Sequence, residues 1–216
     1  MTAPILHSYF RSSTSFRLRI ALNLKGVATC YRAHHLKLGE QSAAAYLNLN
    51  PQGLVPALEL AGGTVLSQSL AIIEYLDETI PDPPLLPADP VTRAKARAIA
   101  QMIACDLHPI NNLRVLNHLR SRFGADDEAV AAWFHHWVAQ TFTPLESVLR
   151  DRERPSPYCF GSRPGLADIC LVAQVANNAR FAVDMAPFPE IQRIHDACMA
   201  LPAFQAAAPA NQPDAE

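Results

Sequence analysis

Four hydroxyl residues stand together in the segment HSYFRSSTSFRLRIAL, between an apolar run and a run with helical spacing: Ser12, Ser13, Thr14 and Ser15. A helix cap requires only one such side chain. The start of a helix also gathers N–H groups and partial positive charge, which suit an anion such as a thiolate. Lowering a thiol pKa by ~2 units costs ~2.7 kcal/mol, which a helix N-terminus and a hydroxyl hydrogen bond supply together. A capped helix with solvated neighbours explains this stretch equally well.

Two further segments carry polar groups at the ends of predicted elements. In NPQGLVPAL, Pro56 falls where a strand begins, so the Val55 backbone can pair with an extended ligand, above all if the Val55-Pro56 bond is cis. In LSQSLAIIEYL, Gln68 and Ser69 lie between a strand and a helix, where the helix N-terminus suits a carboxylate. Taken singly, a strand-entry proline and a capping serine are sufficient explanations.

These residues must be positioned by a small α/β unit. The pattern predicts strands over residues 4–10 and 27–38, helices over 15–25 and 42–50, a hairpin over 55–69 with a turn at Gly62-Gly63, and a further helix over 69–80. Gly26 stands where the first helix should stop. This order predicts a mixed sheet with helices on its faces.

The proline-rich stretch PDPPLLPADP interrupts the chain and reads as an ordered linker. Beyond it the spacing is helical over residues 91–123, 127–150, 166–181 and 189–201, and the last eleven residues read as a loose tail. The sequence therefore predicts an α/β domain over 1–82, a linker over 83–90 and an all-helical domain over 91–216.

Composition narrows the function classes. The 216 residues carry a formal charge of −2, which argues against a generally basic nucleic-acid binder. We expect no membrane association, because no apolar stretch is long enough to span a bilayer, and no export signal is visible at the start. The five cysteines show no metal spacing and no CxxC pair, so we expect a reducing cytoplasm.

Ser-Ser-Thr after the first strand, Val-Pro before the third strand and Gln-Ser before the third helix together resemble the glutathione transferases. Within that superfamily, RSSTSFRLRIALNLKG resembles the zeta class, which includes maleylacetoacetate isomerases. CDLHPINNLRVLNHLR and FGADDEAVAAW are similar to the bacterial glutathione-dependent maleylpyruvate isomerases. The resemblance spans essentially the whole chain. It implies a thioredoxin-like N-terminal domain, a helical C-terminal domain, glutathione as cofactor and a homodimer.

The resemblance also implies roles for individual residues. Ser12, Ser13 and Thr14 would surround the glutathione sulfur. Other residues would hold the rest of the peptide: Gln52 and the Val55 backbone at the cysteinyl and glycyl portions, Gln68 and Ser69 at the γ-glutamyl carboxylate, Gln41 at the glycyl end, and Asp106, His108 and Asn112 from the helical domain. Two positions depart from the family pattern. Thr14 stands where the zeta class usually has cysteine, and Gly165 stands where a threonine or serine usually caps the helix that contains Asp168.

The implied activity is isomerisation of a small dicarboxylate, maleylpyruvate to fumarylpyruvate in gentisate breakdown, by thiolate addition, rotation and elimination. Arg11 would stabilise the enolate, while Arg114 and Arg180 would hold carboxylates through their planar forks; singly, Arg114 and Arg180 read as surface ion-pair partners. Maleylacetoacetate isomerisation in homogentisate breakdown, general glutathione conjugation and a non-catalytic binding module are the alternatives. Tyr9 is the rival to Ser13 or Thr14 as the group that activates the thiol.

Overall fold

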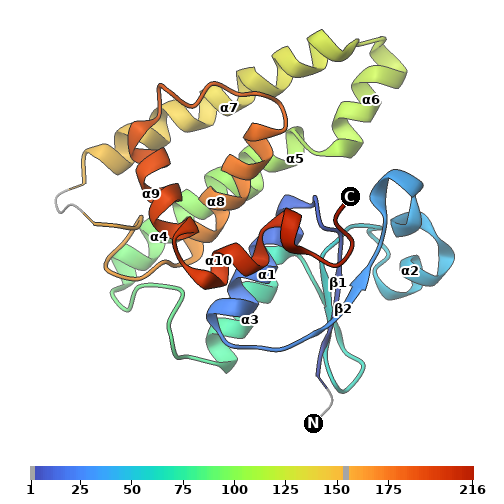
Figure 1. The fold of residues 1–216 in the computed structure, drawn as a ribbon, viewed down its shortest axis with the longest axis horizontal. Coiled ribbons are helices and arrows are strands. Elements are labelled where there is room, and N and C mark those ends of the chain that lie inside the picture. The colour runs from blue at the N-terminus through green and yellow to red at the C-terminus, as the bar shows by residue number, and fades with distance from the viewer. Residues whose placement is uncertain (1–2, 153–155) are drawn as a thin grey trace. The chain divides into compact units, whose positions relative to one another are not determined.

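A four-stranded mixed sheet with the order β2-β1-β3-β4 organises the first part of the chain (Figure 1). Strand β1 (Ile5–Ser8) pairs in parallel with β2 (Cys30–Ala33) and antiparallel with β3 (Ala57–Glu59), which pairs antiparallel with β4 (Val65–Ser67). Helices α1 (Ser13–Leu24) and α3 (Ser69–Thr79) pack against each other. The order βαβ-α-ββα confirms the predicted thioredoxin-like architecture. The computed structural model describes residues 3–152 and 156–216.

The ends of these elements follow local chemistry. Helix α1 begins two residues earlier than predicted because the Ser12 side chain caps it, accepting from the N–H of Ser15 at 3.2 Å. Gly26 has a φ of +66°, and the helix stops just before it. Strand β2 is shorter than predicted, because the chain turns into η1 (Leu36–Leu38) and then η2 (Glu40–Ser42). Helix α2 (Ala44–Leu49) follows.

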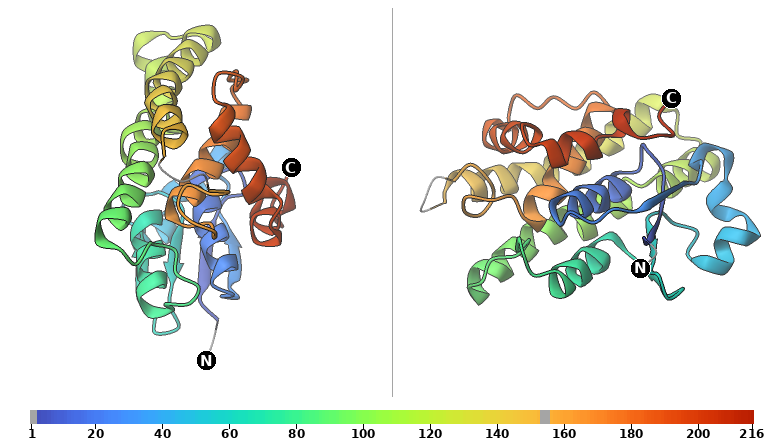
Figure 2. Two further views of the ribbon diagram at one scale, coloured as in Figure 1. Left: turned by 90° about the vertical axis from the view of Figure 1, so that its left-hand side faces the viewer. Right: turned by 60° about the horizontal axis from the view of Figure 1, so that its bottom comes forward.

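Contacts divide the chain into two units, residues 3–85 with Ala200–Glu216, and Leu86–Met199. The predicted loose tail is wrong. Its segment contains the end of α10 (Pro202–Ala207) and all of η4 (Pro209–Asn211), and α10 packs against α1, as Figure 2 shows. Phe204 and Ala207, three residues apart, are both buried, which is too short a pattern to be read as a helix from sequence.

The second unit is helical. Its elements are α4 (Pro90–Gln101), the π-helix η3 (Met102–Leu107), α5 (His108–Ile110), α6 (Leu113–Phe123), α7 (Asp127–Arg150), α8 (Leu166–Ala179) and α9 (Pro189–Met199). Helix α7 has the predicted bounds, and its Asp126 cap accepts from the N–H of Ala129. The predicted helical run over 91–123 is interrupted instead. Pro109 lacks an N–H, and Asn112 adopts an extended backbone and caps α6 with its side chain.

Candidate functional site

The hydroxyl loop before α1 is a chain of hydrogen bonds. Thr14 Oγ1 donates to the Val55 carbonyl at 2.9 Å, and it lies 2.8 Å from Ser12 Oγ. Because the single proton of Thr14 goes to Val55, the Ser12 hydroxyl is the donor in the Ser12–Thr14 pair. The protons of Ser12 and Thr14 are thus both engaged within the protein. For either hydroxyl to donate to a bound sulfur, its present hydrogen bond must be broken.

Side chains of Tyr46 and Asn50 hold the segment around Val55 in place. The Val55-Pro56 peptide bond is cis. The preceding carbonyl, of Leu54, accepts from the Tyr46 hydroxyl at 2.6 Å and from Asn50 Nδ2 at 2.8 Å. Burial raises the pKa of Tyr46 to about 12, against the opposing hydrogen bond from Asn50, so the phenol stays protonated as a donor. Strand entry at Pro56 is therefore fixed by side chains from α2 and the turn after it.

Gln68, in the segment LSQSLAIIEYL, contacts the segment NPQGLVPAL. Its Nε2 donates to Gln52 Oε1 at 2.8 Å, and both side chains are exposed. Its backbone φ of 69° is unusual for a residue other than glycine, a strain that costs about 1–3 kcal/mol and that clusters at functional sites. Gln68 occupies the cap position of α3 without a side-chain capping bond, so Ser69 begins the helix and does not cap it. This uncapped N-terminus suits a carboxylate.

Gln41 lies against the same segment as Gln52. A Cβ at Gly53, whose φ is +61°, would lie 3.2 Å from the Gln41 carbonyl oxygen, so only glycine lets the two stretches approach this closely. The Gln41 Oε1 atom is buried and has no hydrogen-bond donor among the described residues. Within the first unit, the structure therefore gathers Gln41, Gln52, Val55 and Gln68 with the hydroxyl loop.

The remaining predicted residues belong to the second unit. Asn112 Nδ2 lies 3.4 Å from His108 Nε2, and Asn112 Oδ1 accepts from the N–H of Arg114 at 3.1 Å. Asp106 is exposed on the π-helix η3. Arg180 is exposed at the end of α8 and donates to Asn177 Oδ1 at 3.3 Å. The structure thus brings the side chains of His108 and Asn112 together at the start of α6, next to the backbone of Arg114.

Gly165, which departs from the family pattern, has no side chain, so only one of the two bonds of a reciprocal helix cap is present. Asp168 accepts from the N–H of Gly165 at 2.9 Å and from the N–H of Cys159 at 2.7 Å, while the glycine returns no side-chain bond. Burial raises the pKa of Asp168, and these two backbone donors oppose the rise. The carboxylate therefore still anchors α8 without the usual hydroxyl.

Arg19 and Asp214 both contact Phe10, which precedes the hydroxyl loop, and the sequence analysis identified neither residue. Arg19 is 4% exposed, and its Nη2 donates to the Phe10 carbonyl at 3.0 Å. Asp214 Oδ2 accepts from the N–H of Phe10 at 3.0 Å. No local pattern marks Asp214, because it lies 204 residues from its partner in a stretch without helical spacing.

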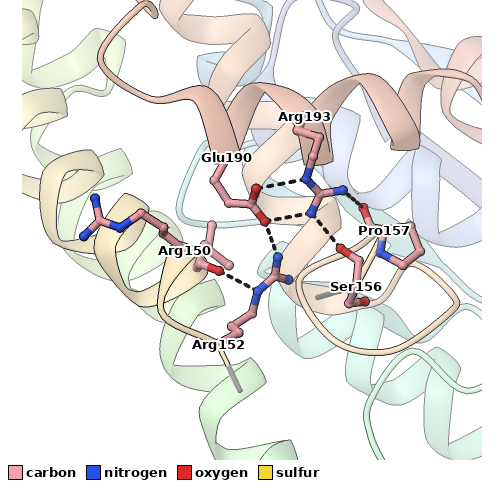
Figure 3. Close-up of a pocket in the computed structure, with 7 residues that line it drawn as sticks. Arg150, Arg152, Ser156, Pro157, Glu190 and Arg193 are labelled. Atoms are coloured by element: carbon pink, nitrogen blue, oxygen red, sulfur yellow. Dashed lines mark hydrogen bonds and ion pairs between the residues drawn. The ribbon is translucent and has the colours of Figure 1, made fainter. Parts of the chain in front are cut away.

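A hollow of about 600 Å³ in the second unit contains none of the predicted site residues (Figure 3). In it Glu190 accepts from Arg152 and, at 2.7 and 2.9 Å, from Arg193. Arg193 also donates to the carbonyls of Ser156 and Pro157. Glu190 is shared by the two arginines, and these bonds tie the segment after α7 to α9, so we assign the hollow a structural role.

Residues 3–152 and 156–216 contain neither a group of metal ligands nor a membrane-spanning helix. No three His, Cys, Asp or Glu side chains are grouped as metal ligands there. Over the same residues, no helix combines the length and the apolar character needed to cross a bilayer.

Comparisons with known proteins agree with this geometry. Residues 11–79 match the glutathione S-transferase N-terminal domain. The maleylpyruvate isomerase of Ralstonia sp is 50% identical, covering 97% of this chain and 98% of that protein. The maleylacetoacetate isomerase of Pseudomonas aeruginosa is 47% identical, covering 97% of each.

Solved structures give the same result. A holo maleylpyruvate isomerase, described as a bacterial zeta-class glutathione S-transferase, has a TM-score of 0.96 and 50% identity, covering 98% of this chain and 100% of that one. A maleylacetoacetate isomerase from Methylobacterium extorquens with bound malonate and glutathione has a TM-score of 0.95 and 38% identity, covering 98% and 99%. The chain belongs to the zeta class of the glutathione S-transferase superfamily, alongside the maleylpyruvate and maleylacetoacetate isomerases.

Proposed function

We propose that this protein is a glutathione-dependent cis–trans isomerase that converts maleylpyruvate to fumarylpyruvate. The observation that carries the proposal is a pair of hydrogen bonds, Thr14 to Val55 and Gln68 to Gln52. With the chain between residues 52 and 55, they join all three predicted motifs into one surface of the first unit. The full-length identity to maleylpyruvate and maleylacetoacetate isomerases supports the reaction class.

The residues present fit glutathione. The uncapped N-terminus of α3 beside Ser69 offers N–H donors for the γ-glutamyl carboxylate, and the buried Gln41 Oε1 is an acceptor in need of a donor. Gln52 and Val55 lie between these points and would hold the peptide backbone. The loop of Ser12, Ser13 and Thr14 would surround the sulfur, whose negative charge the start of α1 stabilises. In the same proposal, we also assign Asp106, His108 and Asn112 of the helical unit to glutathione binding.

When bound, glutathione supplies a thiolate that adds to the cis double bond, which permits rotation about that bond, and is then released unchanged. The protein must therefore hold the substrate carboxylates and stabilise an enolate. Arg11 directly precedes the hydroxyl loop, so we assign it to the enolate. We assign Arg114 and Arg180 to the carboxylates, because a guanidinium fork matches a carboxylate with two parallel hydrogen bonds. The bound malonate in the Methylobacterium extorquens isomerase supports a dicarboxylate substrate.

Maleylacetoacetate is the second candidate substrate, because proteins of both names match the whole chain at similar identity. General glutathione conjugation would call for an apolar substrate site without the three arginines, and a non-catalytic module would not need the hydroxyl loop. We also propose a cytoplasmic homodimer. Light scattering on the purified protein tests the dimer.

The deciding experiment follows maleylpyruvate by proton NMR with the purified protein, with and without glutathione. We expect conversion to the trans isomer that requires glutathione and does not consume it. Conversion of maleylacetoacetate alone would reassign the substrate. Consumption of glutathione with a chlorinated aromatic electrophile, and no isomerisation of either substrate, would replace the proposal with conjugation.

A further inference from the structure

The peptide group of Phe10 is held at both ends by opposite charges. Its N–H donates to Asp214 Oδ2 and its carbonyl accepts from Arg19 Nη2, both at 3.0 Å. Phe10 is buried, and with Arg11 it forms a turn that the N–H of Ser12 closes onto the Tyr9 carbonyl at 3.0 Å. The hydrogen bonds that fix the Phe10 peptide group therefore also fix the backbone from which Arg11 and the hydroxyl loop extend.

Arg19 connects this turn to the C-terminal segment. Its Nε donates to the Ala207 carbonyl at 2.9 Å, and its Nη1 donates to Ser8 Oγ at 3.2 Å. Burial lowers the pKa of Arg19 to about 10, with Tyr31 and Asp214 opposing the fall, so the guanidinium is a cation at neutral pH. A buried cation at this point favours a nearby carboxylate, and Asp214 provides it.

Asp214 reaches from the C-terminal segment to two elements of the first unit. Its Oδ2 holds Phe10, and its Oδ1 accepts from the Tyr31 hydroxyl on β2 at 2.7 Å. Glu216, two residues later, contacts His35 and Lys37 instead, on the exposed stretch after β2. One segment thus carries two carboxylates, of which only the first touches the turn before the hydroxyl loop.

We propose that Asp214 is a positioning residue for the thiolate site, through which the C-terminal segment fixes the Phe10 peptide and so orients Arg11 and Ser12. This inference rests on the proposed function, because it assumes that the hydroxyl loop binds the glutathione sulfur. Asp214 touches neither the peptide cofactor nor the substrate in this proposal. Its effect is geometric, and displacements of about 1 Å can cost about 100-fold in rate.

The test compares Asp214→Ala with Glu216→Ala as the matched control from the same segment. The first readout is the thiol pKa of enzyme-bound glutathione, from thiolate ultraviolet absorbance against pH without substrate. The second is kcat and KM for isomerisation. For Asp214→Ala we expect the thiol pKa to rise by about half a unit or more, and kcat to fall about tenfold. Glu216→Ala should match the wild type in both readouts.

Two further variants separate positioning from plain stability. Asp214→Asn keeps a carbonyl oxygen for the Phe10 N–H and should restore most of the thiol pKa, whereas a merely structural role would change thermal stability and leave the thiol pKa unmoved. Tyr31→Phe leaves the carboxylate in place but removes its second partner, and should shift the thiol pKa in the same direction by less. If Asp214→Ala does not fold, Tyr31→Phe decides the matter.

A wild-type thiol pKa and kcat in folded Asp214→Ala, or equal losses in Asp214→Ala and Glu216→Ala, would overturn the proposal. So would an unshifted thiol pKa in Tyr31→Phe where that variant has to decide. The thiol titration needs no substrate. A wild-type enzyme that lowers the thiol pKa of glutathione but isomerises no maleyl compound would therefore refute the proposed function while leaving the role of Asp214 testable.

Discussion

The Thr14 hydroxyl donates to the carbonyl of Val55 at 2.9 Å, across 41 residues of sequence. Ser12 donates a hydrogen bond to Thr14 Oγ1 and accepts one from the N–H of Ser15. The side chain that caps α1 is therefore linked, through Thr14, to the segment before β3. This bond explains why the loop carries more hydroxyls than a cap requires. Ser12 caps the start of α1, and Thr14 joins the loop to the segment that enters β3.

Replacing Thr14 by valine tests this link. The Val55 carbonyl would lose its donor, and Val55 is only 7% exposed, so we expect the free energy of unfolding to fall by about 1–3 kcal/mol. The Kd for glutathione should rise several-fold because Val55 shifts. Thr14→Ser keeps the hydroxyl and serves as the control. Urea unfolding and glutathione titration calorimetry measure the two effects, and unchanged affinity in Thr14→Val would contradict the link.

Gln68 offers a way to separate backbone strain from binding. Gln68→Gly relieves the φ of 69° but removes the side chain that meets Gln52. We therefore expect the free energy of unfolding to rise by about 1 kcal/mol, while glutathione affinity falls about tenfold, the cost of ~1.4 kcal/mol of lost hydrogen bonding. Gln52→Ala should weaken binding without the gain in stability. A Gln68→Gly variant that binds glutathione like the wild type would contradict a binding role for the Gln68 side chain.

Much of the first unit could be predicted because its signals are local. Gly26 marks the end of α1, as its place after a run with helical spacing predicts. The three motifs each lie at a strand or helix end, where side chains of one sheet edge come together. Their binding roles come from family resemblance and stay predictions. The local sequence pattern predicts only that polar groups lie at the ends of these strands and helices.

What escaped prediction depends on contacts between distant residues. The C-terminal segment is ordered because Phe204 is buried and Asp214 bonds to Phe10, and neither fact leaves a periodic signal. The break before α6 needs both Pro109 and the capping side chain of Asn112 inside a run that otherwise has helical spacing. Arg19 looked like a polar position on a helix, yet it is buried and donates to three main-chain carbonyls.

The three arginines make separable predictions about the reaction. Arg11→Ala should lower kcat about 100-fold, the usual effect of losing one group that stabilises an oxyanion. Arg114→Ala and Arg180→Ala should mainly raise KM for the dicarboxylate, because each removes a charged hydrogen-bonding fork worth about 1.5–3 kcal/mol. Arg120→Ala, which only loses its exposed pair with Asp127, is the control. Steady-state isomerisation kinetics distinguish these effects, and wild-type kinetics in all three variants would remove the assignment.

A pair of histidines, of which His7 is buried and His34 half-buried, gives the first unit a defined pH dependence. His7 Nδ1 lies 2.9 Å from His34 Nε2, and His7 Nε2 lies 3.4 Å from Glu59 Oε2. Burial lowers the pKa of both histidines. Arg32 lowers both further, while Glu59 opposes the shift at His7 and Glu40 opposes it at His34. A bond between two ring nitrogens also needs one of them unprotonated, so the folded chain disfavours two imidazolium rings.

The sign of the effect follows from these directions. The unfolded chain takes up protons near pH 6.5, above the folded pKa of either ring, so the stabilisation is complete above about pH 6.5 and is lost as the pH falls toward the folded values. Each histidine contributes a slope of at most about 1.4 kcal/mol per pH unit. Urea unfolding between pH 7.5 and 5.5 measures it. His7→Gln should flatten the slope, whereas replacing the exposed His118 by glutamine should not. If His7→Gln keeps the full wild-type slope, the loss of stability at low pH arises elsewhere in the chain.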